Sequence, residues 1–301
     1  MPVFAPRRRG LPKEENLEYP KPICANADLH GGAWNLYDKL IEGVPEGICV
    51  KDYCLGTAWS YVDAECGMGV AYTDRGGAKR GTVCDLRGIE LREMAKLSKS
   101  WSFKEATLGI AALNAWYSNP KRLEALGVTY DDDEAVAGNE TVVGDSEDGG
   151  PRCGKRMDAF DVFMPRVDAL GGKAKVVIVG HFPRVERFTE HGELVVLERN
   201  CRDEWDTPDP ACEYVMPQAD FAFITGVTLI NKTAPRLLQL CKDACTVMVG
   251  PSVVMSPVLF DYGVDSLSGS VVGDPEAARF AVQNGAGKFF GRALRMCSMS
   301  R

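Results

Sequence analysis

The sequence KVVIVGHFPRVERF, at residues 175–188, decides the fold class of this chain. Its first six residues form an apolar run of strand length that ends at a glycine. The runs LVVL (194–197), FAFIT (221–225) and TVMVG (246–250) repeat that style. Apolar runs without alternation are typical of strands that are buried on both faces, as in a parallel sheet. We therefore expect these four segments to be strands of one parallel sheet.

Helical patterns separate most of these runs, and two of the helices carry clear start signals. Ser256 and Asp274 are N-cap residue types, and each precedes a proline that fits the first helical position. Gly263 is placed to end the first of these helices. Strands that alternate with helices predict an α/β fold with a Rossmann-like, doubly wound parallel sheet, which we assign to residues 166–301.

Residues 31–128 have a different order of elements and predict a smaller α+β domain. The expected elements are a helix at residues 36–41 that ends near Gly43, strands at 48–53, 57–62 and 69–72, and helices at 91–97 and 101–117. The last helix has apolar residues on both faces, so we expect it to be buried at the junction of the two domains.

Two further segments have the composition of an arm and a linker. Residues 1–30 are rich in proline and charge and predict an extended N-terminal arm. Residues 129–165 form an acidic insertion and linker, because residues 131–148 hold eight acidic side chains and no Lys or Arg. An amphipathic stretch at residues 157–164 is expected to lead into the second domain.

The charge balance limits the classes of partner. The chain has 35 Lys and Arg residues against 42 Asp and Glu residues, which gives a net charge of −7. An acidic chain without a basic stripe lacks the cations that neutralise phosphates, so we do not expect it to bind nucleic acid. No apolar run approaches the roughly 20 residues that span a bilayer, and no apolar stretch follows the N-terminal arginines. We expect a cytoplasmic protein that binds no membrane, and a homodimer is compatible with this class.

The eleven cysteines are an odd number and include no CxxC pair. We expect free, mostly buried thiols in a reducing compartment. The alternative is ligation of a soft metal, for which Cys241 and Cys245 are the closest pair, four residues apart on one face of an expected helix. Two thiols without further neighbours in the sequence give a weak metal signal.

Polar and glycine residues follow each of the four expected strands. In open parallel sheets, ligands bind beyond the carboxyl ends of the strands, near the switch in strand order. The candidate ligand-binding residues are therefore Phe182 and Glu186, Glu198 and Asn200, Thr225 and Gly226, and Gly250, Pro251 and Ser252. Each position also has a structural interpretation, because glycines permit tight turns and Asn231 or Thr233 can cap the next helix.

Glu198 lies 18 positions after Gly180, close to the spacing of the acid that binds ribose hydroxyls in dinucleotide-binding folds. The glycine-rich fingerprint of those folds is absent, because GHFPRVE stands where GxGxxG is required. A conventional NAD site is therefore disfavoured, and a nucleoside or another hydroxylated ligand stays open.

Two residues are candidates for acid–base catalysis. His181 is one of three histidines and follows an expected strand, where an imidazole is well placed to transfer protons. Glu105 is a carboxylate on an apolar face of the helix at residues 101–117, which costs free energy unless the group is paired or used. A structural salt bridge is the alternative for Glu105.

Longer stretches resemble a known family. VVIVGHFPRVERF, VVLERN, ADFAFITGVTLINKT and VGPSVVMSPVLFDYGVDSLSG resemble the C-terminal half of a bacterial and archaeal family named for heavy-metal chelation. LYDKLIEGVPEG and SWSFKEATLGIAALNAWYSNP resemble its N-terminal domain. The resemblance implies an enolase-N-terminal-like domain followed by a Rossmann-like one, with a site between them. It also implies that Trp101 and Glu105 approach His181, Glu198 and residues 250–252.

Three hypotheses for the function follow. The first is a small-molecule-binding protein or enzyme linked to heavy-metal chelation and homeostasis, whose ligand or metal chelate lies between the two domains. The second is a group transferase that uses a nucleoside cofactor similar to S-adenosylmethionine. The third is a protein that binds metal directly through its thiols. The sequence names no cofactor, metal or reaction.

Overall fold

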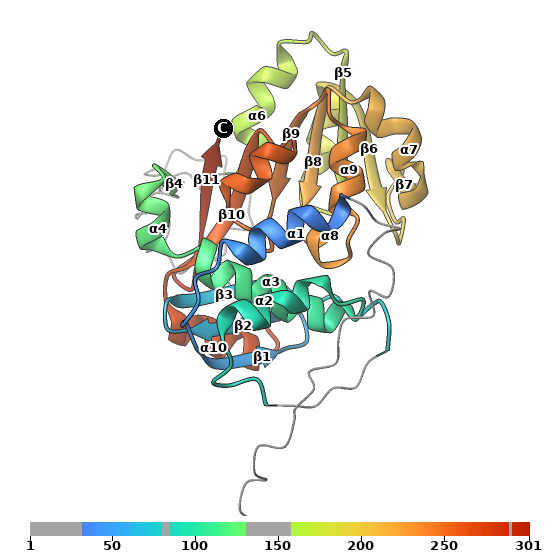
Figure 1. The fold of residues 1–301 in the computed structure, drawn as a ribbon. Coiled ribbons are helices and arrows are strands. Elements are labelled where there is room, and N and C mark those ends of the chain that lie inside the picture. Colours follow the sequence, from blue (N-terminus) through green and yellow to red (C-terminus); the bar gives the residue numbers. More distant parts are fainter. Residues whose placement is uncertain (1–31, 80–84, 131–157, 289–290) are drawn as a thin grey trace, which may run out of the picture.

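The computed structural model describes residues 32–79, 85–130, 158–288 and 291–301. The expected arm at residues 1–30 and the acidic segment at residues 131–148 lie outside the described residues. The described residues form one sheet of three strands and one of eight. Figure 1 shows the large sheet above the small one, with helices α1 (Ala33–Glu42) and α3 (Phe103–Tyr117) between them.

The small sheet is antiparallel and belongs to the N-terminal part of the chain. Its strands β1 (Val50–Leu55), β2 (Trp59–Ala64) and β3 (Gly67–Tyr72) pair in that order. The other elements of this part are α2 (Leu91–Ala95), the 3₁₀ helix η2 (Lys96–Lys99) and α4 (Pro120–Ala125). The expected order of helix, three strands and helices is therefore confirmed.

Helix α3 is buried on nearly all sides, as its two apolar faces predicted. Every residue from Ala106 to Ala115 is buried. Its one amide side chain in that stretch, Asn114, donates a hydrogen bond of 2.9 Å from Nδ2 to the carbonyl oxygen of Val70 on β3. The helix therefore packs directly against the small sheet and fixes the edge strand that carries Tyr72.

The large sheet is mostly parallel, which confirms the expected fold class. Its order is β4 (Thr129–Tyr130), β11 (Leu294–Ser300), β10 (Ser266–Val272), β9 (Cys245–Val249), β8 (Phe221–Thr225), β5 (Ala174–Val179), β6 (Gly192–Glu198) and β7 (Asp206–Pro208). The strands from β10 to β7 are parallel to their neighbours, β11 is antiparallel to β10, and β4 is antiparallel to β11. The four expected strands are β5, β6, β8 and β9.

The order of the strands reverses between β5 and β8. The chain runs outward from β5 through β6 to β7, and then returns to the other side of β5 to form β8, β9 and β10. The carboxyl ends of β5 and β8 therefore lie at the topological switch point, which is where open α/β sheets bind ligands.

Short helices connect the strands of the large sheet. They are α6 (Ala159–Asp168), η3 (Val185–Glu190), η4 (Asp209–Ala211), α7 (Cys212–Val215), η5 (Met216–Gln218), α8 (Val227–Ile230), α9 (Ala234–Leu240), η6 (Pro257–Tyr262) and α10 (Pro275–Gln283). The start signals are confirmed, because Ser256 Oγ accepts a hydrogen bond from the N–H of Val258, and Asp274 Oδ1 accepts from that of Glu276. Gly263 ends η6 in the left-handed conformation. The segments that contain Glu186 and Val258 are 3₁₀ helices.

Successive side chains of the central strands enter two different cores. Val176 and Ile178 of β5 pack with Phe160 of α6, whereas Val177 and Val179 belong to the core on the other face. This second core contains residues of α1, α3, α8 and α9, so it is shared by the N-terminal and C-terminal parts of the chain. The continuous apolar runs of the sequence follow from burial on both faces.

Helix α10 packs against the small sheet, although it lies near the C-terminal end of the chain. Ala278 and Val282 of α10 share a core with Trp59 and Tyr61 of β2. Arg279 of the same helix forms an ion pair of 2.7 Å with Asp63. The small sheet is therefore held between α3 on one side and α10 on the other.

None of the helices in the described ranges is both long enough and apolar enough to cross a membrane.

Candidate functional site

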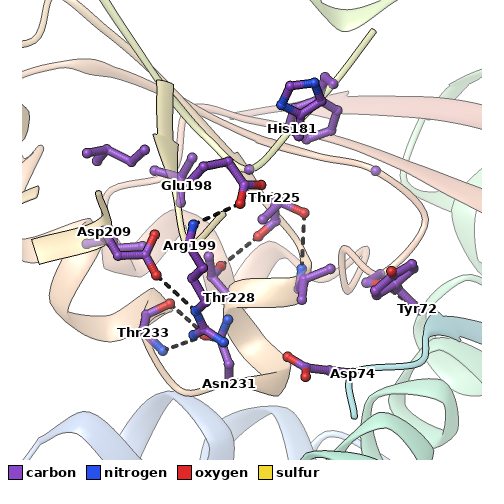
Figure 2. Close-up of a pocket in the computed structure, with 18 of the residues that line it drawn as sticks. Tyr72, Asp74, His181, Glu198, Arg199, Asp209, Thr225, Thr228, Asn231 and Thr233 are labelled. Atoms are coloured by element: carbon purple, nitrogen blue, oxygen red, sulfur yellow. Dashed lines mark hydrogen bonds and ion pairs between the residues drawn. The ribbon is translucent and has the colours of Figure 1, made fainter. Parts of the chain in front are cut away.

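A cavity of about 780 Å³ lies at the carboxyl ends of β5, β6, β8 and β9. Trp59, Tyr72 and Asp74 of the N-terminal part line its other side. Figure 2 shows Tyr72 and Asp74 across the cavity from Glu198 and Asp209. The cavity therefore lies between the two parts of the chain, at the topological switch point.

Eight of the twelve candidate residues line this cavity: His181, Phe182, Glu198, Asn200, Thr225, Gly250, Pro251 and Ser252. They come from four strand ends that are separated by up to about 70 residues in the sequence. Parallel strands bring their carboxyl ends to one edge of the sheet, and this explains why the segments meet.

The turns after β5 and β9 require glycine. Gly180 has a φ of 100° and Gly250 a φ of 102°, which are values that residues with a Cβ rarely adopt. Both turns let the chain leave the sheet at once, so that His181 and Ser252 stand at the edge of the cavity. The two turns therefore require glycine, as the structural interpretation states. Both glycines also form part of the cavity wall.

Gly226 does not line the cavity, and close packing explains why a glycine is present. A Cβ at this position would lie 2.3 Å from the backbone nitrogen of Val253 and 2.4 Å from the carbonyl carbon of Ser252. The end of β8 thus touches the loop after β9 through its backbone. This contact fixes the wall in which Thr225 and Ser252 lie.

Ser252 joins the two parts of the chain at the cavity. Its Oγ accepts a hydrogen bond of 2.8 Å from the N–H of Tyr72, the last residue of β3. Next to it, the carbonyl oxygen of Pro251 accepts a bond of 3.3 Å from Asn114 Nδ2. These two bonds fix β3 and α3 of the N-terminal part against the loop after β9.

Glu198 ends β6 and is partly buried. Its Oε2 accepts a hydrogen bond of 2.8 Å from the N–H of Arg199, which orients the carboxylate. Arg199 Nε donates a bond of 2.9 Å to Asp209 Oδ2, so Arg199 contacts one carboxylate through its backbone and the other through its side chain (Figure 2).

Asn231 and Thr233 also line the cavity. Asn231 Oδ1 accepts hydrogen bonds of 3.1 Å and 2.7 Å from the N–H and Oγ1 of Thr233. Thr233 is the N-cap residue of α9, but its side chain makes no capping bond. The pair thus orders the start of α9, and the side chains remain part of the cavity wall.

Trp101, Glu105 and Glu186 do not line the cavity. Trp101 packs edge-on against Trp34, with 5.8 Å between the ring centroids. Glu105 lies in the first turn of α3, where a helix favours a negative charge, and Ser100 Oγ donates a hydrogen bond of 2.5 Å to its Oε2. The cavity therefore gives no support to the assignment of these residues to the site.

Several lining residues were not among the sequence candidates. They are the aromatic residues Trp59 and Tyr72 and the charged residues Asp74, Arg199, Arg202, Asp209, Lys232, Arg236 and Lys288. Arg199 lies between the candidates Glu198 and Asn200, in the segment expected to follow strand β6. The others come from the ends of β2 and β3, from turns, from η4 and α9, and from the segment after α10, where no local pattern indicates a cavity.

The described cysteines are free, and most of them are partly or fully buried. Burial raises the pKa of Cys212, which lines the cavity, and raises that of Cys66 to about 11. The expected helical pair is wrong, because α9 ends at Leu240 and Cys245 begins β9. In the part of the chain that the structure describes, the only cluster with metal-ligand spacing contains no thiol.

Comparison with known proteins places the chain in a family. Residues 37–117 match the DUF4213 family and residues 159–296 match the DUF364 family, both described as "putative heavy-metal chelation". An uncharacterised protein of Methanocaldococcus jannaschii is 26% identical over 254 residues, which cover 79% of this chain and 85% of that protein.

Two crystal structures of DUF364 proteins of unknown function are similar to this chain. The protein from Desulfitobacterium hafniense DCB-2 is 31% identical with a TM-score of 0.75, over 90% of this chain and 99% of that one. The protein from Pyrococcus horikoshii is 21% identical with a TM-score of 0.69, over 89% and 99%, and supports the fold. The chain therefore belongs to the DUF364 family, as the motifs at its strand ends predicted.

Proposed function

We propose that this protein binds an anionic organic ligand, of the class that chelates metal ions, in the cavity between its two parts. The observation that carries the proposal is the charge of the lining. Five lining residues are permanent cations, namely Arg199, Arg202, Lys232, Arg236 and Lys288, whereas three are carboxylates, namely Asp74, Glu198 and Asp209. The lining thus has an excess of two positive charges in a chain whose net charge is −7.

Two of these cations, Arg202 and Lys288, form no ion pair with a carboxylate of the described residues, although Arg202 lies near Asp206. Arg199 pairs with Asp209, and Arg236 pairs with Glu213. No described carboxylate lies within ion-pair distance of the side chains of Arg202 or Lys288. Lining cations without partners attract an anionic ligand, and they gain a charge-assisted hydrogen bond when it binds.

The rest of the lining favours a ligand that has hydroxyl groups as well as acids. Thr225 lies near Glu198 at the strand ends (Figure 2), and Asn231, which follows α8, adds a further polar side chain to the lining. Trp59 and Tyr72 offer an apolar wall on the opposite side, with their rings 5.6 Å apart in a T-shaped arrangement. Hydroxylated polycarboxylates combine these groups, and their oxygen atoms ligate metal ions. The family description is compatible with such a ligand.

His181 is the candidate acid–base group of the site. It lines the cavity at the end of β5, and its Nε2 lies 3.4 Å from Asp203 Oδ2. A carboxylate in this position orients the imidazole. The lining therefore includes one imidazole held by a carboxylate, in the same cavity as the cations that would bind the ligand.

Isothermal titration with citrate tests the proposal, since citrate is a hydroxylated tricarboxylate. We expect saturable binding that weakens as sodium chloride is added, because salt screens exposed charges. Arg202→Gln and Lys288→Gln should each weaken it about tenfold, equivalent to about 1.4 kcal/mol. Lys173→Gln is the matched control, because Lys173 is an exposed cation at the opposite edge of the sheet.

Equal citrate affinities in Arg202→Gln, Lys288→Gln and Lys173→Gln would refute the cationic site, and so would the lack of saturable citrate binding at low salt.

A nucleoside cofactor is the second candidate, and one observation favours it. Glu198 lies in the cavity at the end of β6, the strand that pairs with β5, and this is where related folds bind ribose hydroxyls. S-adenosylhomocysteine should then raise the melting temperature of the wild-type protein but not that of Glu198→Gln. No stabilisation at millimolar concentration would reject this alternative.

A further inference from the structure

Three side chains with metal-ligand chemistry gather at the edge of the cavity. His181 follows β5, Asp203 lies in the turn between β6 and β7, and Asp206 is the first residue of β7. One ligand atom of each residue lies within 4.8 Å of those of the other two. His181 Nε2 and Asp203 Oδ2 are 3.4 Å apart.

The turn before β7 holds Asp206 in place. Asp206 Oδ2 accepts hydrogen bonds of 2.6 Å and 3.0 Å from the N–H groups of Arg202 and Asp203. These two bonds fix the position of the Asp206 carboxylate beside His181 and Asp203.

The other oxygen of the same carboxylate is left without a partner. Asp206 Oδ1 is buried, and no hydrogen-bond donor of the described residues reaches it. A buried polar atom without a partner costs about 1–3 kcal/mol and calls for an explanation, such as an ion. A cation beside Asp206 would satisfy this oxygen.

The exposure of the cluster leaves room for further ligands. The side chains of His181 and Asp203 are 43% and 39% exposed. Three protein ligands with open positions are typical of metal sites that bind a water molecule or a small ligand. An imidazole with two carboxylates suits divalent transition metals such as zinc, cobalt and nickel.

We propose that His181, Asp203 and Asp206 form a binding site for a divalent transition-metal ion at the edge of the cavity. His181 belongs to both the metal cluster and the cavity lining, so a bound anion has access to the open positions of the metal. Binding of the anion to the metal deepens the proposed function and rests on it. Binding of the metal ion alone is independent of the proposed function.

Titration of the metal-free, full-length protein with cobalt chloride, without citrate, tests the metal site. Cobalt is the probe because its visible spectrum distinguishes thiolate ligands from nitrogen and oxygen ligands. We expect one equivalent to bind with a spectrum free of thiolate bands. His181→Ala and Asp206→Asn should weaken binding at least tenfold, and the asparagine side chain keeps an oxygen that can accept the bonds of the turn.

His191→Ala is the matched control, because His191 lies just before β6 at the opposite edge of the sheet and pairs with Asp168. Loss of binding in His181→Ala with full binding in His191→Ala would support the site. Because the His181 side chain is exposed, we expect His181→Ala to fold. The test therefore does not depend on whether Asp206→Asn folds. Unchanged binding in His181→Ala, a thiolate spectrum or no saturable binding would overturn the metal site.

Citrate titration of the metal-free protein separates the two proposals. Cobalt binding without citrate binding would reject the proposal that the cavity binds an anion, and it would support the metal site. Citrate binding without cobalt binding would reject the metal site alone.

Discussion

Replacement of Gly226 by alanine should destabilise the ligand-free protein strongly, although the backbone at this position suits alanine. Gly226 has a φ of −59°, and exchange of glycine for alanine at a compatible φ commonly stabilises a protein by about 0.4–1 kcal/mol. The structure predicts the opposite sign. The new Cβ would lie 2.3 Å from the nitrogen of Val253, whereas ordinary contacts begin at 3.4 Å.

The size of the effect follows from what surrounds the position. The three nearest atoms, at 2.3 Å to 2.8 Å, all belong to the backbone of Ser252 and Val253, so no flexible side chain can move aside. The deficit of about 1.1 Å must be met by a shift of the loop after β9. Overpacking of a rigid core typically costs about 1–3 kcal/mol, and we expect the upper end, near 3 kcal/mol. The melting temperature should fall by roughly 5–10 °C.

Urea denaturation followed by tryptophan fluorescence measures this change. Gly287→Ala is the matched control, because a Cβ there meets no atom within 4 Å and the φ of Gly287 is not left-handed. The control should stay within about 0.5 kcal/mol of the wild type or be slightly more stable. If Gly226→Ala were as stable as Gly287→Ala, the close contact between β8 and the loop after β9 would be wrong.

Three further predictions concern the cores and the contact of α10. Phe223→Ala should lower the free energy of unfolding, measured by urea denaturation, by about 3–5 kcal/mol, because Phe223 is fully buried and contacts three other phenylalanine rings. A loss below about 1 kcal/mol would contradict this packing. Arg279→Met should lower the free energy of unfolding by about 2 kcal/mol in the same assay, since it leaves the partly exposed Asp52 and Asp63 without their cation. An unchanged free energy of unfolding would mean that solvent screens these ion pairs. Burial, and then the hydrogen bond to Asp52, raise the pKa of Tyr61 to about 12. Because the unfolded value is near 10, the stabilisation from Tyr61 is complete below pH 10 and is lost as the pH rises to 12. The advantage of wild type over Tyr61→Phe in the free energy of unfolding should therefore shrink by up to roughly 3 kcal/mol, and an advantage that is constant from pH 9 to 12 would refute the shift.

The local sequence was sufficient to predict the central strands, because a strand that is buried on both faces is a continuous apolar run in the sequence. Strand β10 gives no such run, since Ser266, Ser268 and Ser270 alternate with other residues. All seven residues of β10 are nevertheless buried, and two of its serines bond to serines of β11. The alternation looks like that of a half-exposed strand, so β10 could not be predicted from its pattern.

Part of the cavity lining could be predicted for the same reason. Strand ends can be read from the sequence, and they identified His181, Glu198, Thr225 and Ser252 as neighbours. Glu105 was selected because a carboxylate on an apolar helix face needs a partner or a function. The start of α3 and the bond from Ser100 provide a local reason for this residue instead.

The sequence by itself determined the parallel sheet, the caps of its helices and the family, because periodicity and capping are local properties of the chain. The tertiary structure decided which charged groups meet. Arg202 and Lys288 line one cavity although they are far apart in the sequence, and Asp203 and Asp206 meet His181 only because β7 pairs with β6. The charge of a cavity and the ligand set of a metal are properties of long-range contacts, and no local pattern of residues encodes them.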